Sequence, residues 1–294
     1  MEIKAKRACY FMLAPFMILF LIFTVVPVAS AVFLSFTHFN MLEMPRWIGF
    51  SNYARLILDD QIFLKIIQNT LVFAVITGPL SYLFSFIFAW FINDLRPKLR
   101  SVMTLVFYLP SLSGNLFLVW AFIFSNDAYG FVNSTLRQLG FIQDPIEWLT
   151  NERYVLGVLI IVQLWLSLGA GFLAFIAGFQ SIDRSLYEAS AIDGVRNRWQ
   201  ELIFVTIPSM GPQLLFGAVM QISVSFGVSR VIMALAGFPT IGYSADTVVT
   251  YILDYGTVRY EMGYASAIAV LLFTAILFLN AIITKTLRKK TNFD

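Results

Sequence analysis

Six stretches of the chain contain no Asp, Glu, Lys or Arg and are rich in large apolar residues. They cover residues 8–42, 66–93, 101–126, 154–182, 202–229 and 262–284. The shortest has 23 residues, so as a helix rising about 1.5 Å per residue it exceeds the roughly 30 Å hydrocarbon core of a bilayer. Runs of this length without alternation are typical of helices rather than barrel strands. The pattern predicts six membrane-spanning helices, at about residues 10–36, 67–93, 101–125, 154–180, 204–229 and 263–284.

The composition agrees with a membrane protein. Hydrophobic residues make up 59% of the 294 residues, charged residues 13%, and the mean hydropathy is +0.78, which lies outside the range of soluble domains. A short basic start followed by an apolar run, with Ala-Ser-Ala at 29–31, also resembles a cleaved signal peptide. The apolar core of a signal has only about 7–15 residues. We therefore expect the first run to remain as a helix of a single transmembrane domain, residues 1–294.

The distribution of Lys and Arg predicts the orientation. If the N-terminus is cytoplasmic, 13 of the 20 Lys and Arg residues fall on the inside, and the other seven fall in or near outside loops. The inside residues are Lys4, Lys6, Arg7, Arg96, Lys98, Arg100, Arg184, Arg196, Arg198, Lys285, Arg288, Lys289 and Lys290. The positive-inside rule then places both termini in the cytoplasm.

Residue types suited to catalysis or metal binding are scarce. The single cysteine, Cys9, rules out an internal disulfide and a cysteine-based metal cluster. The single histidine, His38, lies at the end of the first predicted helix, where we interpret it as an interfacial polar side chain. No phosphate-binding GxxxxGK[ST] motif occurs. The sequence predicts no catalytic residue, metal site or cofactor in this chain, and the net charge of +3 fits anionic lipid rather than nucleic acid.

Seven charged residues cluster between the fourth and fifth apolar runs, in the segment 183–203. They are Asp183, Arg184, Glu188, Asp193, Arg196, Arg198 and Glu201. Small and apolar residues on one face and charges on the other predict two short helices along the cytoplasmic surface. Asp193 followed by Gly194 predicts a sharp reversal between them, because glycine accepts left-handed backbone. Taken alone, these residues also fit a solvated loop with a turn.

The full pattern resembles the EAA loop of permease subunits of ABC importers. The matching stretch is EASAIDGVRNRWQELIFVTIPSMGP, with Glu188, Ala189, Asp193, Gly194, Ile207, Pro208 and Pro212 at the family's spacing. Ser190 stands where the family usually has a second Ala, and Ile207 where it often has Leu. Segments 49–60, 68–75, 131–140, 147–149 and 260–273 resemble the carbohydrate-uptake branch. The similarity is to the first permease of a heteromeric, maltose/glycerol-phosphate-type pair.

This resemblance implies a location in the inner (cytoplasmic) membrane of a bacterial cell, and it also implies a fold, partners and coupling residues. The fold is all-α, with six transmembrane helices of the type I ABC importer permease and a cytoplasmic coupling (EAA) helix. The implied partners are a second permease, two cytoplasmic ATPase subunits that bind ATP and Mg, and an extracytoplasmic binding protein that delivers a carbohydrate. In this family the EAA helix docks in a cleft on the ATPase, with its Glu facing a basic partner. The coupling residues would be Glu188, Ala189, Ser190, Asp193, Gly194 and Pro208.

Polar side chains within the apolar runs are candidates for contact with the solute, because they are costly in lipid unless they face the bundle interior. We select Asn115, Gln163, Ser167, Gln221 and Ser225. Gln163 and Ser167 are four residues apart, as are Gln221 and Ser225, so each pair lies on one helix face. Because their helices flank the charged segment, we expect a shared cavity near mid-membrane. Hydrogen bonding between helices is the alternative, and Asn69, near a helix end, fits that alternative best.

Three other functions are compatible with parts of the sequence. A permease of an ABC importer for an amino acid or polyol would keep the EAA pattern, and the segments named above favour a carbohydrate. A secondary transporter would be expected to carry Asp, Glu or Lys within its spans, and the six runs have none. A structural membrane scaffold would not need the EAA spacing.

Overall fold

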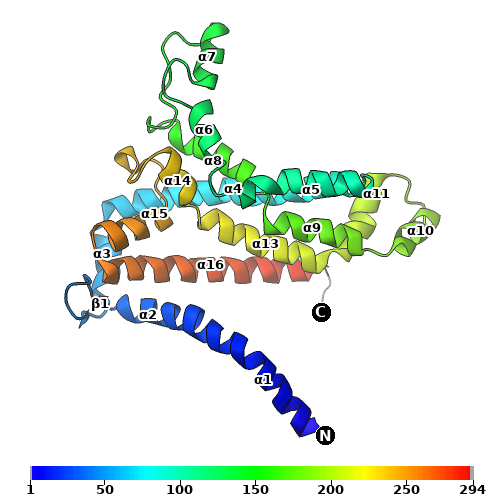
Figure 1. The fold of residues 1–294 in the computed structure, drawn as a ribbon, viewed down its shortest axis with the longest axis horizontal. Helices are drawn as coiled ribbons and strands as arrows, with labels where there is room; N and C mark the ends of the chain where they lie inside the picture. The colour runs from blue at the N-terminus through cyan, green and yellow to red at the C-terminus, as the bar shows by residue number, and fades with distance from the viewer. Residues whose placement is uncertain (1, 292–294) are drawn as a thin grey trace. The chain divides into compact units, whose positions relative to one another are not determined.

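The computed structural model describes the backbone of residues 2–291 and the side chains of residues 10–286. Cys9 and the terminal basic residues predicted to face the cytoplasm, Lys4, Lys6, Arg7, Arg288, Lys289 and Lys290, lie outside the described side chains. Helices dominate the described residues, as predicted (Figure 1). The extended backbone forms one short antiparallel pair that joins Thr37 to Trp47 and His38 to Arg46.

The chain forms two compact units. The first contains residues 1–63 and 251–274. Its elements are α1 (Glu2–Phe20), η1 (Leu21–Val25), α2 (Val26–Leu34), β1 (Thr37–His38), β2 (Arg46–Trp47), α3 (Ser51–Leu58), η4 (Asp254–Val258) and the start of α16 (Met262–Thr291).

The second unit contains residues 64–250 and 275–294. Its elements are α4 (Gln61–Asn93), α5 (Pro97–Leu112), α6 (Leu118–Ile123), α7 (Phe131–Gln138), α8 (Val155–Leu166), α9 (Ala170–Ser181), α10 (Arg184–Ile192), α11 (Arg198–Glu201), η2 (Leu202–Thr206), α12 (Ile207–Ser209), α13 (Gly211–Phe226), α14 (Arg230–Leu235), η3 (Ile241–Tyr243) and most of α15 (Val248–Leu253). Both α4 and α16 continue across the division between the units.

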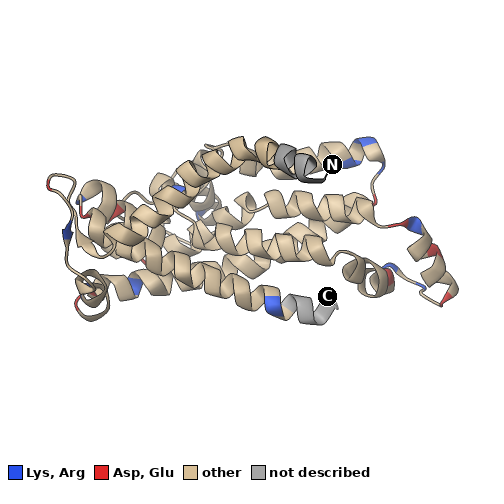
Figure 2. Ribbon diagram, turned by 90° about the horizontal axis from the view of Figure 1, so that it is seen from below, with Lys and Arg blue, Asp and Glu red and all other residues tan. Residues whose placement is uncertain are grey.

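Five helical runs in the described part of the chain are long and apolar enough to cross a membrane, by length and composition. They are Tyr10–Leu34, Gln61–Asn93, Val155–Ser181, Gly211–Leu235 and Met262–Thr286. In Figure 2 the long helices are almost entirely free of charged residues, which gather near their ends and in the connecting segments. These five runs correspond to the first, second, fourth, fifth and sixth predicted spans.

The third and fourth predicted spans each consist of two helices in the structure. Residues 101–125 form α5 and α6 with a turn at 113–117, and the fourth span divides into α8 and α9 at 167–169. Pro110 removes a backbone donor near the end of α5, and Ser113 after it is extended, with φ −87° and ψ 117°. Irregular backbone at membrane depth is tolerated where it is buried in protein or lines a water-filled space.

Helices α9 and α13 lie side by side and approach closely through glycines (Figure 1). A Cβ added to Gly171 would lie 3.5 Å from the Cα of Gly217, and a Cβ added to Gly217 would overlap the ring of Phe175. Around this contact Phe172, Phe175 and Met210 are fully buried. Small residues therefore bring together the two helices that flank segment 183–203.

Asn133 organises the loop between α6 and α8. Its side chain is fully buried, and Nδ2 lies 2.9–3.1 Å from the carbonyl oxygens of Ser125, Asp127 and Ile146. Its Oδ1 accepts from the backbone N–H of Ile146 at 3.1 Å and from Nε1 of Trp148 at 2.9 Å. One side chain thus joins both ends of the loop around α7.

A cluster of tyrosines in the first unit surrounds Asp60. Its Oδ2 accepts hydrogen bonds from the hydroxyls of Tyr251 at 2.7 Å and Tyr264 at 2.6 Å. Arg55 pairs with Glu261 at 2.5 Å and lies 4.3 Å from the centre of the Tyr264 ring. These contacts connect α3 and the start of α4 to the start of α16.

Candidate functional site

Helix α10 is the first of the two short helices predicted in segment 183–203. Asp183 caps it, because its Oδ1 accepts from the backbone N–H of Ser185 at 3.0 Å. Hydrogen bonding from Ser185 also lowers the pKa of Asp183. The cap thus remains charged and intact at neutral pH, which fixes the first residue of the helix at Arg184.

Gly194 ends α10 in a Schellman motif. Its φ is +95°, in the left-handed region that favours glycine. The N–H of Val195 donates to the carbonyl of Ser190 at 3.0 Å, and the N–H of Gly194 to that of Ala191 at 3.4 Å. The predicted reversal is therefore present, and these two hydrogen bonds define its geometry.

The two faces of α10 differ in exposure. Glu188 and Ala189 are exposed, and so is the apolar side chain of Ile192, at 88%. Ser190, in contrast, is buried, and its hydroxyl donates to the carbonyl of Tyr187 at 2.9 Å. The exposed face combines one carboxylate with small and apolar side chains, whereas Ser190 faces the protein. Sequence reasoning did not single out Ile192.

Helix α11 holds the other end of the segment. Asn197 caps it by accepting from the N–H of Gln200 at 2.9 Å, and the Gln200 side chain accepts from the N–H of Arg196 at 2.8 Å. The ring of Trp199 lies 4.8 Å from that of Trp90 at the end of α4. The reciprocal caps and the ring contact fix α11 against the second predicted span.

Arg198 adds a charged contact to the same place. It forms an ion pair with Asp94, just beyond α4, and its guanidinium lies 5.6 Å from the centre of the Trp90 ring. Sequence reasoning placed Arg198 among the cytoplasmic charges without finding these partners, which are about a hundred positions away in the chain.

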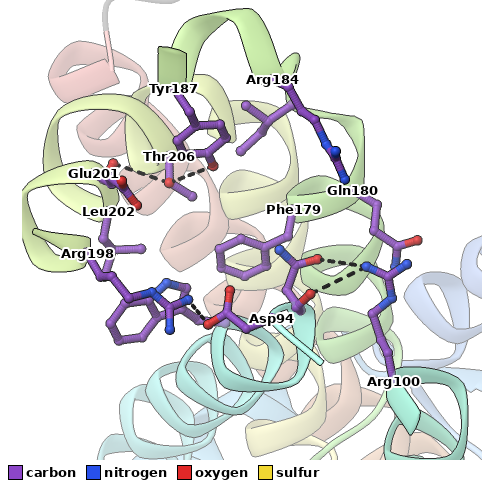
Figure 3. Close-up of a pocket in the computed structure, with 13 residues that line it drawn as sticks. Asp94, Arg100, Phe179, Gln180, Arg184, Tyr187, Arg198, Glu201, Leu202 and Thr206 are labelled. Atoms are coloured by element: carbon purple, nitrogen blue, oxygen red, sulfur yellow. Dashed lines mark hydrogen bonds and ion pairs between the residues drawn. The ribbon is translucent and has the colours of Figure 1, made fainter. Parts of the chain in front are cut away.

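The segment closes over a cavity of about 440 Å³ (Figure 3). The hydroxyls of Tyr187 and Thr206 meet across it at 2.9 Å and connect α10 to η2. The lining residues come from the end of α4, the start of α5, the end of α9 and the segment itself. They are Trp90, Asn93, Asp94, Arg100, Phe179, Gln180, Ile182, Arg184, Tyr187, Arg198, Glu201, Leu202 and Thr206.

Pro208 lies in α12, directly after the π-helical turn η2. Proline has no N–H and crowds the turn before it, so a change of helical pitch at this point is the expected consequence. Pro212 occupies the first turn of α13, where a missing donor costs least. The two prolines thus mark where the segment gives way to the fifth predicted span.

Four of the five candidate solute residues are buried in this chain. Gln163 and Ser167 belong to α8 and its end, and Gln221 and Ser225 to α13. Both serine hydroxyls donate within their own helix, Ser167 to the carbonyl of Leu164 at 2.6 Å and Ser225 to that of Ile222 at 3.0 Å. The two glutamine amides are the better candidates for hydrogen bonding to a solute.

Asn115 differs from these four, because it lies exposed in the turn that divides the third predicted span. Its backbone carbonyl accepts from the N–H of Leu118 at 3.0 Å. A cavity of about 330 Å³ lies between α4, α5 and α8, with Trp165 in its wall. None of the five candidates lines that cavity, which has a mainly aromatic and aliphatic wall.

Two further contacts support helix packing for part of the polar set. Asn69 donates to the carbonyls of Tyr243 at 2.9 Å and Asp246 at 3.2 Å, as its predicted structural role requires. A Cβ on Gly78 would lie 3.4 Å from the hydroxyl of Ser225. Ser225 therefore lies close to α4.

Comparison with known proteins gives consistent matches. A family model described as the binding-protein-dependent transport system inner membrane component matches residues 81–291. The chain is 32% identical to the probable ABC transporter permease protein YesP of Bacillus subtilis (strain 168), over 96% of this chain and 91% of that protein. It is 28% identical to the arabinooligosaccharides transport system permease protein AraP of the same organism, over 95% and 88%.

A solved structure matches the fold over nearly the whole chain. It is a bacterial ABC transporter involved in the import of the acidic polysaccharide alginate, with a TM-score of 0.76 and 26% identity, over 98% of this chain and 97% of that one. The sequence relatives and the structural neighbour thus agree in type of protein and in the extent of the match.

Proposed function

Since the chain belongs to the family of binding-protein-dependent transport system inner membrane components, we propose that it is the permease of an ABC importer for a carbohydrate, with an oligosaccharide favoured. The family membership makes it a multi-pass membrane protein and a transport subunit. The carbohydrate follows from the names of its relatives, one of which transports arabinooligosaccharides. An external binding protein would deliver the solute, and a second, different permease would complete the pathway.

The chain crosses the membrane six times in this proposal, with both termini in the cytoplasm. Five crossings are the apolar helical runs, and the third is the broken pair α5 and α6. The excess of Lys and Arg in alternate connecting segments supports this orientation.

The orientation is tested by labelling intact cells with an impermeant thiol reagent. After Cys9 is replaced, a new cysteine at Arg137 is expected to react and one at Arg196 is not. Labelling at 196 without labelling at 137 would show that the proposed orientation is wrong.

Helix α10 would transmit the action of cytoplasmic ATPase subunits, which bind ATP and Mg and carry out the hydrolysis. The observation that carries this assignment is its exposed face, where Glu188 and Ala189 lie beside the exposed apolar Ile192. A carboxylate among small and apolar side chains suits a groove with a basic residue in it. Ser190, Asp193, Gly194 and Pro208 would shape the segment rather than touch the partner.

The same geometry indicates how closure of the ATPase dimer would reach the membrane. Helix α10 is connected to η2 by Tyr187 and Thr206, and α11 to α4 by Arg198 and its neighbour Trp199. A displaced α10 would therefore move the second, fourth and fifth spans together. The permease pair would then alternate between inward- and outward-facing states as a two-state element.

The coupling assignment is tested by charge reversal. Glu188→Lys is expected to lower retention of the ATPase and solute uptake while expression stays normal. Asp144→Lys is the matched control, since Asp144 is an exposed acid in the outside loop. Normal retention and full uptake in Glu188→Lys would show that α10 is not the docking helix.

The solute pathway is proposed to use Asn115, Gln163, Ser167, Gln221 and Ser225, with Gln163 and Gln221 as the principal contacts. Neutral amides suit a polyhydroxylated solute, and weak binding suits a site that must release it. Gln163→Ala and Gln221→Ala are expected to reduce uptake with assembly and basal ATPase activity intact. Normal transport in both variants would assign these residues to helix packing.

A permease for an amino acid or polyol is the alternative within the same family. To separate the two functions, ATP hydrolysis by the reconstituted importer is measured with its binding protein and each candidate solute in turn. Stimulation by an oligosaccharide is the expected result.

A further inference from the structure

The cavity beneath segment 183–203 has a basic side that the coupling role does not use. Arg100 enters from the first turns of α5, and Arg184 from the first residue of α10. Figure 3 shows both on the same side of the cavity as Gln180, at the end of α9. Three hydrogen-bond donors, two of them cationic, thus come from three different helices to one place.

The acidic lining residues do not neutralise this side. Asp94 is paired with Arg198, and Figure 3 shows Glu201 on the opposite side, beside Leu202. The guanidinium of Arg100 makes long contacts, at 3.4 and 3.5 Å, with the backbone and side-chain oxygens of Asn93. Among the described residues, neither Arg100 nor Arg184 has a carboxylate within ion-pair distance. Two guanidinium groups at one cavity therefore lack an anionic partner.

The lining of the cavity suits a phosphate group with an apolar extension. A planar guanidinium forms paired hydrogen bonds to phosphate oxygens, and two such groups bind more strongly than one. Phe179, Ile182 and Leu202 supply apolar wall in the same cavity. Under the proposed orientation the cavity also lies at the cytoplasmic leaflet, where basic pockets bind anionic lipid headgroups.

We propose that Arg100, Arg184 and Gln180 form a binding site for a phosphate-bearing anion, as in the headgroup of an anionic phospholipid. Because α10 contributes Arg184, an occupied site would hold α10 against α5 and α9. A bound anion would therefore change the affinity of α10 for the ATPase, in addition to any effect of the bilayer as a whole.

The test uses the assembled importer with its ATPases, stripped of bound lipid. Native mass spectrometry measures binding of phosphatidylglycerol and of phosphatidylcholine, and thermal shifts measure binding of inorganic phosphate. The variant is Arg100→Gln with Arg184→Gln. The matched control is Lys98→Gln, which removes a positive charge from the same helix at an exposed position outside the cavity.

Phosphatidylglycerol is expected to bind the wild type more tightly than phosphatidylcholine, and the double variant to lose about tenfold to thirtyfold in affinity, at about 1 kcal/mol per basic residue. The Lys98→Gln affinity should stay within about threefold to sixfold of wild type, as removal of one such contribution allows. A comparable loss for inorganic phosphate alone would identify free phosphate as the source and still support the site.

Three results would overturn the proposal. One is an unchanged affinity of the double variant for both the lipid and phosphate. Another is an equal loss in Lys98→Gln, which would indicate a general surface potential. The third is release of the ATPase by the double variant with anion binding unchanged, which would place the arginines at that interface. If the double variant does not assemble, Arg100→Lys with Arg184→Lys repeats the comparison, with weaker but detectable binding expected.

Discussion

The reversal after α10 allows a test in which the expected cost comes from backbone conformation alone. Gly194 has φ +95°, and a Cβ added there would meet nothing within 4 Å. The change Gly194→Ala therefore adds no clash and removes no contact. It places a Cβ-bearing residue in left-handed backbone, at a cost of about 1–2 kcal/mol.

That cost acts on the reversal through its two hydrogen bonds, from Val195 to Ser190 and from Gly194 to Ala191. A penalty of one or two kcal/mol reduces the ratio of formed to unformed reversal by a factor of about 5–30. Asn tolerates left-handed backbone better than Ala does, so Gly194→Asn should lie between wild type and Gly194→Ala. If docking requires the reversal, the affinity for the ATPase falls by at most the same factor.

Gly140 at the end of α7 is a closely matched control. Its φ is +76° and it also has nothing within 4 Å of an added Cβ. The N–H of Phe141 donates to Leu136 at 2.9 Å and that of Gly140 to Arg137 at 3.0 Å, which repeats the hydrogen-bond pattern of α10. The change Gly140→Ala thus imposes the same strain in the loop between α6 and α8.

The assay measures the affinity of the permease pair for the ATPase in detergent and solute-stimulated ATP hydrolysis in proteoliposomes. Gly194→Ala is expected to weaken ATPase binding about fivefold to thirtyfold, and Gly140→Ala to leave it at the wild-type value. An equal loss of ATPase affinity in the two variants would refute the reasoning, because the effect would then not depend on whether the strained reversal follows α10 or α7. Wild-type hydrolysis and uptake in Gly194→Ala would refute the requirement for the reversal itself.

Two further predictions concern how segment 183–203 is held. Gly217→Ala should lower the thermal stability of the purified permease by the equivalent of about 1–3 kcal/mol, because the new methyl meets the Phe175 ring. Gly171→Ala should lower it less, and equal losses of stability would contradict the packing argument. The side chains of the ion pair between Asp94 and Arg198 are 37% and 55% exposed, respectively, so its energy is about 0.2–1 kcal/mol. Asp94→Arg should reduce coupled uptake, and adding Arg198→Asp should restore it. If the charge exchange does not restore uptake, the loss comes from another contact.

The apolar runs and the reversal could be predicted because both depend on local sequence. A run without charge indicates a span wherever it occurs, and Asp193-Gly194 indicates a turn by backbone chemistry. The breaks at 113–117 and 167–169 were missed because apolar side chains continue through them. Hydropathy reports which solvent a residue prefers, and it does not report whether the backbone hydrogen bonds continue. Pro110 was the available signal for the first break.

The contacts that hold the charged segment in place were outside the reach of sequence reasoning. Trp90 and Trp199 are both apolar residues at helix ends, and nothing in either neighbourhood indicates that their rings meet. Among the candidate solute residues, spacing placed each pair on one helix face but not its neighbour, so the approach of Gly78 to Ser225 came only from the structure. Long-range pairing needs the fold, because a single sequence carries no distance information.

The close approach of α9 and α13 at Gly171 and Gly217 has a consequence for how these two helices can move. A Cβ added to Gly171 would already be in van der Waals contact with Gly217, and the Phe175 ring occupies the space that a Cβ on Gly217 would need. Helices that interlock in this way resist sliding along each other, since close-packed interiors do not deform continuously. We expect them to move relative to each other by rotation about the place where Gly171 and Gly217 approach. A displacement of segment 183–203 would therefore be expected to change the angle between α9 and α13 rather than to slide one helix along the other.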